Sequence, residues 1–174
     1  MKDKIKNIRL LLLDVDGVLT NGEIAYGFDD LELKTFNVKD GLGIKLAISA
    51  GLKIGIITGR GSEALDKRVA ELGIEIFYQK VRNKIIPFED VKRNLSIENE
   101  QIAYVGDDLN DLKVMKQVGL KCTVADAAED IKDIADYITK KSGGKGAVRE
   151  VIELVLRGQG KWEQSIENFL KGDE

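Results

Sequence analysis

Two aspartates separated by one residue follow four leucines in the segment LLLLDVDG, residues 10–17. The leucines predict a buried strand, and burial opposes the charged form of a carboxyl group. Asp14 and Asp16 therefore require compensating charge nearby, such as a bound cation or a lysine. Paired acids at a strand end are typical of sites that hold metals or transfer protons, although aspartates at such places also cap helices.

Three further polar motifs stand at corresponding places later in the chain. ITGR (57–60) ends a second apolar segment, GDDLND (106–111) ends another, and Lys84 opens the helix that follows a third. The carboxyl ends of parallel strands lie at one edge of a sheet, where the ligands of such folds bind. Each motif is weak evidence alone, but their common position predicts one shared site.

The chemistry that fits this set is phosphoryl transfer through an aspartyl-enzyme intermediate. Asp14 is the expected nucleophile, since an aspartate is ionised at neutral pH. Its repulsion by phosphate oxygens must be cancelled, and Mg²⁺ bound through oxygen ligands does this. Asp14, Asp107 and Asp108 are the expected carboxylate ligands, supplemented by a backbone carbonyl.

The other polar groups match the remaining needs of such a reaction. Asp16 can protonate the leaving alkoxide and then deprotonate the attacking water. The Thr58 hydroxyl and the Gly59 amide can bind phosphoryl oxygens, and the Lys84 ammonium can neutralise their charge. The expected catalytic residues are therefore Asp14, Asp16, Thr58 and Lys84.

The composition narrows the function classes. The net charge is −3 with acidic and basic residues mixed, which argues against a nucleic-acid or anionic-membrane partner. The chain has no histidine, which excludes Ser-His-Asp and Cys-His catalysis and histidine-ligated zinc. The single Cys122 suits a reducing compartment, and the first apolar run is too short for a signal peptide or a membrane span. We therefore expect a cytoplasmic protein.

Short apolar segments alternate with helical patterns and predict a three-layer α/β fold with a Rossmann-like parallel sheet. Residues 22–41 interrupt the alternation with two strand-like stretches around GFDD, which predict a β-hairpin flap after the first strand. The length favours a single domain over 1–174, with residues 143–174 as a C-terminal helix and tail. The expected strands cover residues 8–15, 52–59, 74–79, 101–107, 120–126 and 136–140, and the expected helices cover 41–51, 62–73, 84–95, 111–119, 128–135 and 147–158.

The motifs resemble those of the haloacid dehalogenase-like (HAD) hydrolase superfamily, with DVDGVLT, ITGR, Lys84 and GDDLND as its four motifs. Over nearly the whole chain, DVDGVLTNG, FNVKDGLGIK, YVGDDLNDLKVM and GGKGAVREVIELVLRGQGKW resemble the 3-deoxy-D-manno-octulosonate 8-phosphate (KDO 8-phosphate) phosphatase family. The resemblance implies a capless HAD-like fold and a magnesium-dependent phosphoric monoester hydrolase that releases KDO in lipopolysaccharide precursor synthesis. It also implies a homotetramer assembled through the hairpins, with neighbouring subunits helping to close each site.

The resemblance also assigns roles to individual positions. It implies that Asp14 is both nucleophile and magnesium ligand, that Asp107 is a second ligand, and that the backbone carbonyl of Asp16 faces the metal. The expected metal-binding set is Asp14, Asp16, Asp107 and Asp108. The expected substrate-binding set is Asp16, Asn37, Val38, Lys39, Asp40, Gly41, Lys45, Thr58, Gly59, Arg60, Arg68 and Lys84. A guanidinium at Arg60 or Arg68 can pair bidentately with a sugar-acid carboxylate, whereas Lys45 stands where the family often has arginine.

Several alternatives stay open at this level. A capless phosphatase could serve a nine-carbon sugar acid 9-phosphate, of a sialate or of deaminated neuraminate. A receiver-like signalling domain also uses Asp, Thr and Lys with magnesium, but its phosphoacceptor lies on a later strand. The stretch from Gly143 to Gly146 could be a hinge or a helix lead-in, and Arg68 could be a solvated helix residue. The tail after Gly160 has no assignable role, although Trp162 and Phe169 could bury on a neighbouring subunit.

Overall fold

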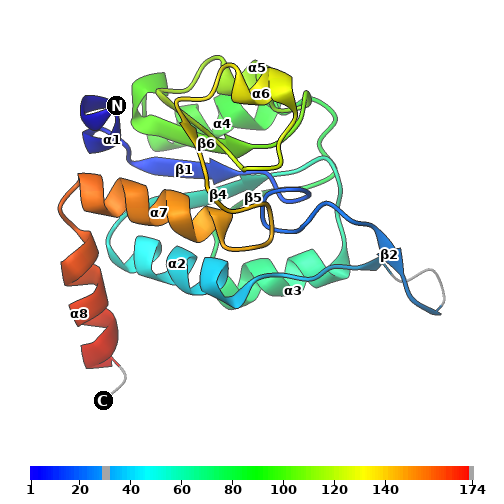
Figure 1. The fold of residues 1–174 in the computed structure, drawn as a ribbon, viewed down its shortest axis with the longest axis horizontal. Coiled ribbons are helices and arrows are strands. Elements are labelled where there is room, and N and C mark those ends of the chain that lie inside the picture. The colour runs from blue at the N-terminus through cyan, green and yellow to red at the C-terminus, as the bar shows by residue number, and fades with distance from the viewer. Residues whose placement is uncertain (29–31, 173–174) are drawn as a thin grey trace.

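The central sheet has six parallel strands in the order β5-β4-β1-β6-β7-β8 (Figure 1). The computed structural model describes residues 1–28 and 32–172. The predicted α/β fold with a parallel sheet is confirmed. The strands of this sheet are β1 (Leu10–Leu13), β4 (Lys53–Ile57), β5 (Ile76–Tyr78), β6 (Ile102–Gly106), β7 (Leu120–Thr123) and β8 (Tyr137–Ile138).

Helices cover both faces of the sheet and complete the predicted three layers (Figure 1). On one face lie α2 (Val38–Ser49), α3 (Glu63–Leu72) and α7 (Ala147–Gly158). On the other face lie α4 (Ile85–Leu95), α5 (Leu112–Met115) and α6 (Glu129–Lys132). The short helix α1 (Lys2–Lys6) contacts α7, and a 3₁₀ turn, η2 (Asn99–Gln101), leads into β6.

The strand β1 forms the centre of the core. Its four leucines are fully buried, as expected for a parallel strand that is covered on both faces. It pairs with β4 on one side and β6 on the other, so that Leu13 lies opposite Ile56 and Val105. This register brings the carboxyl ends of the three strands to the same level, and Asp14 follows directly.

The hairpin after β1 is present but shorter than predicted. Its strands β2 (Ala25–Tyr26) and β3 (Glu32–Leu33) pair antiparallel, while Asp29 and Asp30 of the predicted turn lie outside the described residues. The prediction that the hairpin extends to residue 41 and that a helix begins there is wrong. Helix α2 begins at Val38, because the Asn37 side chain caps it by accepting the Lys39 amide at 2.9 Å.

The extents of other helices also depart from the sequence patterns. Ser62 caps α3 by accepting the Leu65 amide at 3.2 Å. Helices α5 and α6 span only Leu112–Met115 and Glu129–Lys132, less than the predicted 111–119 and 128–135. Within residues 1–28 and 32–172, every helix falls short of the length and apolar character that a bilayer crossing requires.

A helix that the sequence patterns did not predict, α8 (Trp162–Gly172), follows α7 and contacts α2 and α7. Trp162 is buried at its start, where the guanidinium carbons of Arg149 and Arg157 lie 4.8 and 5.1 Å from the centroid of its ring system. Cations over an indole face are attracted by its quadrupole. Trp162 is therefore buried within its own chain, without a neighbouring subunit.

Candidate active site

An open cleft of about 390 Å³ lies at the carboxyl ends of β1, β4 and β6. The chain leaves β1 toward β4 and β5 and later returns to β6 on the other side, so the cleft lies at a switch in strand order. Ligands of open α/β sheets bind at such points. The cleft is lined by Asp14, Asp16, Gly22, Thr58, Gly59, Arg60, Asp107, Asp108, Leu109 and Asn110.

A buried lysine bridges two acids at the floor of the cleft. Lys84 Nζ lies 2.7 Å from Asp14 Oδ2 and 2.7 Å from Asp111 Oδ1, and all three side chains are at most 4% exposed. Asp111 Oδ1 also accepts the Tyr104 hydroxyl at 2.6 Å, and its Oδ2 accepts the Asp107 amide at 3.0 Å. Since Asp111 is held by groups of β6, it fixes the ammonium of Lys84 against Asp14.

Asp111 is a site residue that the sequence analysis did not single out. Within GDDLND the expected ligands were Asp107 and Asp108. In the structure, oxygens of Asp14, Asp107 and Asp111 lie within 4.8 Å of one another. Asp108 is exposed at the rim, where its carboxylate accepts the Leu109 amide at 2.7 Å. The available signal was the spacing, because a residue four positions after Asp107 can return to the same side of a helical turn.

Burial and neighbouring carboxylates set the ionisation of these acids. Burial, followed by the charge of Asp111, raises the pKa of Asp14 to about 6, although Lys84 opposes the shift. Burial and the charges of Asp14 and Asp111 raise the pKa of Asp107 to about 7. Burial acts to lower the pKa of Lys84, but Asp14 and Asp111 outweigh it and raise that pKa above its usual value. The site keeps Lys84 charged and disfavours the ionised forms of Asp14 and Asp107.

This charge imbalance suits a divalent cation. When Asp14, Asp107 and Asp111 are ionised, three negative charges face the single positive charge of Lys84. Carboxylate oxygens are preferred ligands of Mg²⁺, whose charge would balance the excess. Asp14 and Asp107 line the open cleft and would hold the ion, whereas Asp111 is fully buried and does not line the cleft.

A second group of charges lies at the mouth of the cleft. Lys34 is the residue that follows β3. Its ammonium group contacts the Asp16 carboxylate and lies 3.1 Å from Glu32 Oε1. Arg60 Nη2 lies 2.9 Å from Glu32 Oε2, and its Nε lies 3.9 Å from Asp16 Oδ2. These alternating charges hold the hairpin against the cleft. The sequence analysis named neither Glu32 nor Lys34, although residues two apart on a strand share one face.

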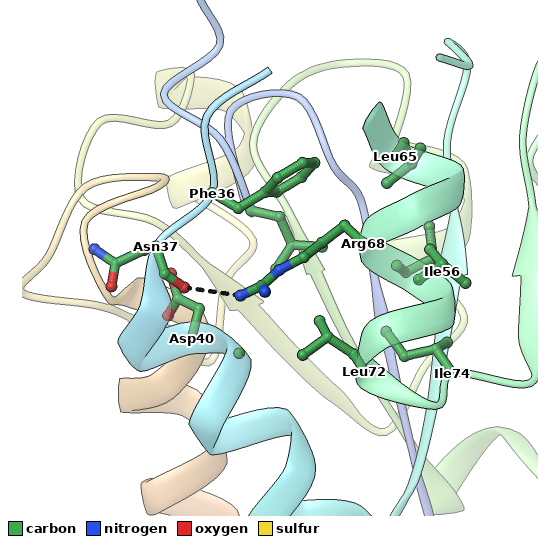
Figure 2. A pocket seen from close by; sticks show the side chains of 11 residues that line it. Phe36, Asn37, Asp40, Ile56, Leu65, Arg68, Leu72 and Ile74 are labelled. Atoms are coloured by element: carbon green, nitrogen blue, oxygen red, sulfur yellow. Dashed lines mark hydrogen bonds between the residues drawn. The ribbon is translucent and has the colours of Figure 1, made fainter. Parts of the chain in front are cut away.

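The remaining predicted substrate-binding residues do not line this cleft. Figure 2 shows Arg68 extending from α3 toward the start of α2, where its Nη2 lies 3.5 Å from the Asn37 carbonyl oxygen. The cavity around them has a volume of about 10 Å³, enough for about one water. A larger groove of about 470 Å³ on the outside of α2 and α3 is lined by Val38, Gly41, Leu42, Lys45, Arg68, Glu71, Leu72 and Phe169.

Comparison with known proteins agrees with this architecture. A family model described as haloacid dehalogenase-like hydrolase matches residues 74–152. The Legionella pneumophila structure of a HAD superfamily (subfamily III A) hydrolase superposes with a TM-score of 0.95 at 39% identity, covering 98% of this chain and 93% of that one. The chain is a HAD-like hydrolase of the capless type, since the described residues between β1 and α2 form only the short hairpin.

Two further relatives define the family within this class. KDO 8-phosphate phosphatase KdsC of Escherichia coli (strain K12) is 50% identical over 162 residues, covering 93% of this chain and 86% of the relative. The crystal structure of KDO 8-phosphate phosphatase from Moraxella catarrhalis, in complex with magnesium ion, phosphate ion and KDO, superposes with a TM-score of 0.93 at 41% identity and covers 97% of both chains. The chain belongs to the KDO 8-phosphate phosphatase (KdsC) family. The resemblance seen in the sequence is confirmed, and the receiver-domain alternative is excluded.

Replacing Lys84 by methionine tests the bridge between Asp14 and Asp111. Removal of one partner from a buried ion pair leaves uncompensated charge and costs about 3–5 kcal/mol. We therefore expect the variant's free energy of unfolding to fall by that amount at about pH 8. The pKa values of Asp14 and Asp107 are already raised above their ordinary values, and they rise further without the lysine. As the pH falls toward about 5, Asp14 and Asp107 become protonated and no longer repel each other. The loss of unfolding free energy relative to the wild type therefore becomes smaller.

The matched control is Lys92→Met on the same helix, where the ammonium forms a surface pair with Glu89 at 3.2 Å. Surface pairs contribute about 0–1 kcal/mol, and we expect little dependence of this loss on pH. Unfolding free energies from urea titrations at both pH values give the comparison. Equal losses in the two variants, or a Lys84→Met loss that is independent of pH, would contradict the assigned role of Lys84.

Proposed function

We propose that the chain hydrolyses KDO 8-phosphate to KDO and phosphate in a magnesium-dependent reaction. The observation that carries the proposal is Asp14 itself, a largely buried acid that lines the cleft and is paired with buried Lys84. Membership in the KdsC family supports the substrate. The M. catarrhalis relative, crystallised with magnesium ion, phosphate ion and KDO, supports the metal and both products.

Asp14 and Asp16 divide the covalent steps between them. A carboxylate oxygen of Asp14 attacks phosphorus and forms a new P–O bond, while the bond from phosphorus to the sugar oxygen breaks. Asp16 gives its proton to the leaving alkoxide. Water then attacks phosphorus as Asp16 takes a proton from it, and cleavage of the P–O bond to Asp14 restores the carboxylate.

The other cleft residues orient the phosphoryl group and balance its charge. Thr58 is 1% exposed at the end of β4, which places its hydroxyl and the Gly59 amide beside the acids that line the cleft. Lys84 fixes the orientation of Asp14 through its contact at 2.7 Å. Mg²⁺ bound at Asp14, the Asp16 carbonyl and Asp107 would reduce the repulsion between nucleophile and phosphate oxygens.

Arg60 is the proposed contact for the sugar-acid carboxylate. Its side chain is 42% exposed and lines the same cleft as the acids. A guanidinium offers paired N–H donors that match a carboxylate. In the structure the Arg60 guanidinium binds one carboxylate, that of Glu32, at 2.9 Å, and this contact supports the proposed role.

The groove of about 470 Å³ on the outside of α2 and α3 supports a further part of the proposal. This part is a homotetramer in which neighbouring subunits complete each site. Lys45 and Arg68 line this groove, and Val38 is 78% exposed at the start of α2. These groups do not line the cleft of their own chain, so in the proposed assembly they serve a neighbour. Lys39 is also exposed there.

A cytoplasmic location is proposed on the basis of Cys122. The thiol is fully buried in β7, and burial raises its pKa to about 12. A buried, protonated thiol is unreactive and does not form disulfides, which is compatible with a reducing compartment. The absence of a second cysteine in the sequence excludes an internal disulfide.

Substitution of the two acids tests the division of roles. Asp14→Asn is expected to abolish turnover without unfolding the protein, because the amide has the same shape but is not a nucleophile. Asp16→Asn is expected to lower kcat by about 10² to 10⁴, the usual contribution of a positioned acid or base. Phosphate release assays and circular dichroism provide the two readouts. Substantial turnover by folded Asp14→Asn would contradict the covalent mechanism.

A substrate panel tests the proposed activity. We would measure kcat/KM for KDO 8-phosphate, a nine-carbon sugar acid 9-phosphate, glucose 6-phosphate and p-nitrophenyl phosphate, each with Mg²⁺ and with a chelator. KDO 8-phosphate is expected to be preferred over glucose 6-phosphate by about 10²-fold or more, since an unpaired polar group in the site is costly. Chelation should abolish turnover. Preference for the nine-carbon compound would move the assignment to that alternative.

The hairpin provides the test of assembly. Phe28 is 97% and Tyr26 is 65% exposed, which is typical of an interaction surface. Light scattering should give four times the 19.3 kDa chain mass for the wild type and a smaller species for Phe28→Asp, with a loss of KDO 8-phosphate turnover. The control is Leu170→Asp on α8, where the leucine is 63% exposed. A fully active monomeric wild type would contradict the proposed assembly.

A further inference from the structure

The loop from Gly143 to Gly146 packs backbone against backbone on the turn that follows β1. The Gly144 amide donates to the Val18 carbonyl oxygen at 2.9 Å. A Cβ atom added to Gly143 would lie 1.8 Å from the Gly17 carbonyl oxygen, and one added to Gly144 would lie 2.6 Å from the Thr20 carbonyl carbon. Such contacts leave no room for a side chain. The loop is therefore a tight support for this turn, which does not fit a hinge.

The same turn meets the active site on its other side. Gly17 has φ +81°, and a Cβ atom there would lie 2.0 Å from Asp107 Oδ2. The turn is thus enclosed between the Asp107 carboxylate and the loop at Gly143. Asp16 directly precedes Gly17, so the position of this turn sets where Asp16 stands relative to Asp107.

Two side chains at the N-terminal end of α2, those of the capping residue Asn37 and of Asp40, hold the loop and the helix that follows it. Asp40 is 1% exposed, and its Oδ1 accepts the amide of Arg149 at 2.7 Å, in the first turn of α7. Gly146, which precedes α7, has no side chain to cap that helix, so Asp40 supplies the cap from a distant part of the chain. Asn37 Nδ2 donates to the Gly144 carbonyl oxygen at 3.2 Å.

The surroundings of Asp40 fit a structural carboxylate. Burial raises the pKa of its carboxyl above the usual value, while the amides of Arg149 and Gly146 and the cations Lys141 and Arg149 oppose the shift. Its side chain is directed to α7, as the bond to Arg149 requires. The Oδ1 atom of Asp40 is thus engaged within its own chain, and Asp40 does not line the cleft.

We propose that Asn37 and Asp40 are positioning residues, which hold the Gly143–Gly146 loop against the turn at Gly17 and thereby fix Asp16 relative to Asp107. The resemblance to the KdsC family led us to expect both as substrate-binding residues. The inference rests on the proposed role of Asp16 in phosphate ester hydrolysis. It predicts effects on the chemical step for every phosphomonoester, whereas a substrate ligand would affect only the sugar-acid phosphate.

The first experiment compares Asp40→Ala and Asp40→Asn with two substrates, KDO 8-phosphate and p-nitrophenyl phosphate. Asp40→Ala should lower kcat about 10- to 100-fold on both, with KM nearly unchanged, because a displacement of about 1 Å at a catalytic group costs about that much. Asp40→Asn should restore most of kcat, since asparagine also caps helices. An unchanged kcat, or a defect confined to KM for KDO 8-phosphate, would overturn the proposal.

The second experiment reaches the same turn from the loop side. Gly144 and Gly160 have similar backbone angles, φ +64° and +68°, but a Cβ atom on Gly160 meets nothing within 4 Å. Gly144→Ala should therefore lower kcat on both substrates, and Gly160→Ala should not. Thermal unfolding checks that each variant is folded. If Gly144→Ala does not fold, the comparison of Asp40→Ala with Asp40→Asn tests the proposal by itself.

The proposed function and this inference can fail separately. If the wild type turns over p-nitrophenyl phosphate but not KDO 8-phosphate, the substrate assignment fails. The kcat pattern of the Asp40 and Gly144 variants on p-nitrophenyl phosphate then still tests the positioning role. Equal kcat values for Gly144→Ala and Gly160→Ala, both folded, would overturn the inference even if the substrate assignment is correct.

Discussion

The contact between Lys84 and two buried acids is the interaction on which the site depends. Asp14 ends a fully buried strand, where an unpaired carboxylate would be costly. Lys84 compensates it at 2.7 Å, and Asp111 holds the lysine in place through its own contacts with β6. The bridge joins the end of β1, the start of α4 and the start of α5. The same ion pairs that stabilise this junction also orient the acid that faces the cleft.

The sequence predicted those parts of the site that follow from strand order. Apolar segments fix which residues become parallel strands, and the alignment of β1 with β4 and β6 brings Asp14, Thr58 and Asp107 to one cleft. To predict that these residues meet, it is enough to know where the strands end, and apolar segments in the sequence indicate those ends well. The class of reaction followed from the residue types at these ends together with the lack of histidine.

Side-chain direction and long-range partners could not be predicted in the same way. Asp108 and Asp111 differ little in sequence context, yet one is exposed at the rim and the other fully buried, because the turn after β6 directs them differently. The hydrogen bond from the Arg149 amide to Asp40 joins residues that are 109 positions apart, and the local sequence at neither end reveals it. Helix α8 is held by the packing of Trp162 against two arginines of α7, a tertiary contact that its own sequence does not reveal.

The place of the glycine loop in the chain has a consequence for synthesis. Every reactive acid and Lys84 precede residue 112, whereas the amide that bonds to the Val18 carbonyl oxygen belongs to Gly144. Chains are made from the N-terminus, so a nascent chain contains all the reactive groups before the backbone that supports the turn beside them exists. A shortened gene product that ends before this loop would keep the signature motifs and lack that support. Motif content alone is therefore a poor guide to whether a truncated relative is active.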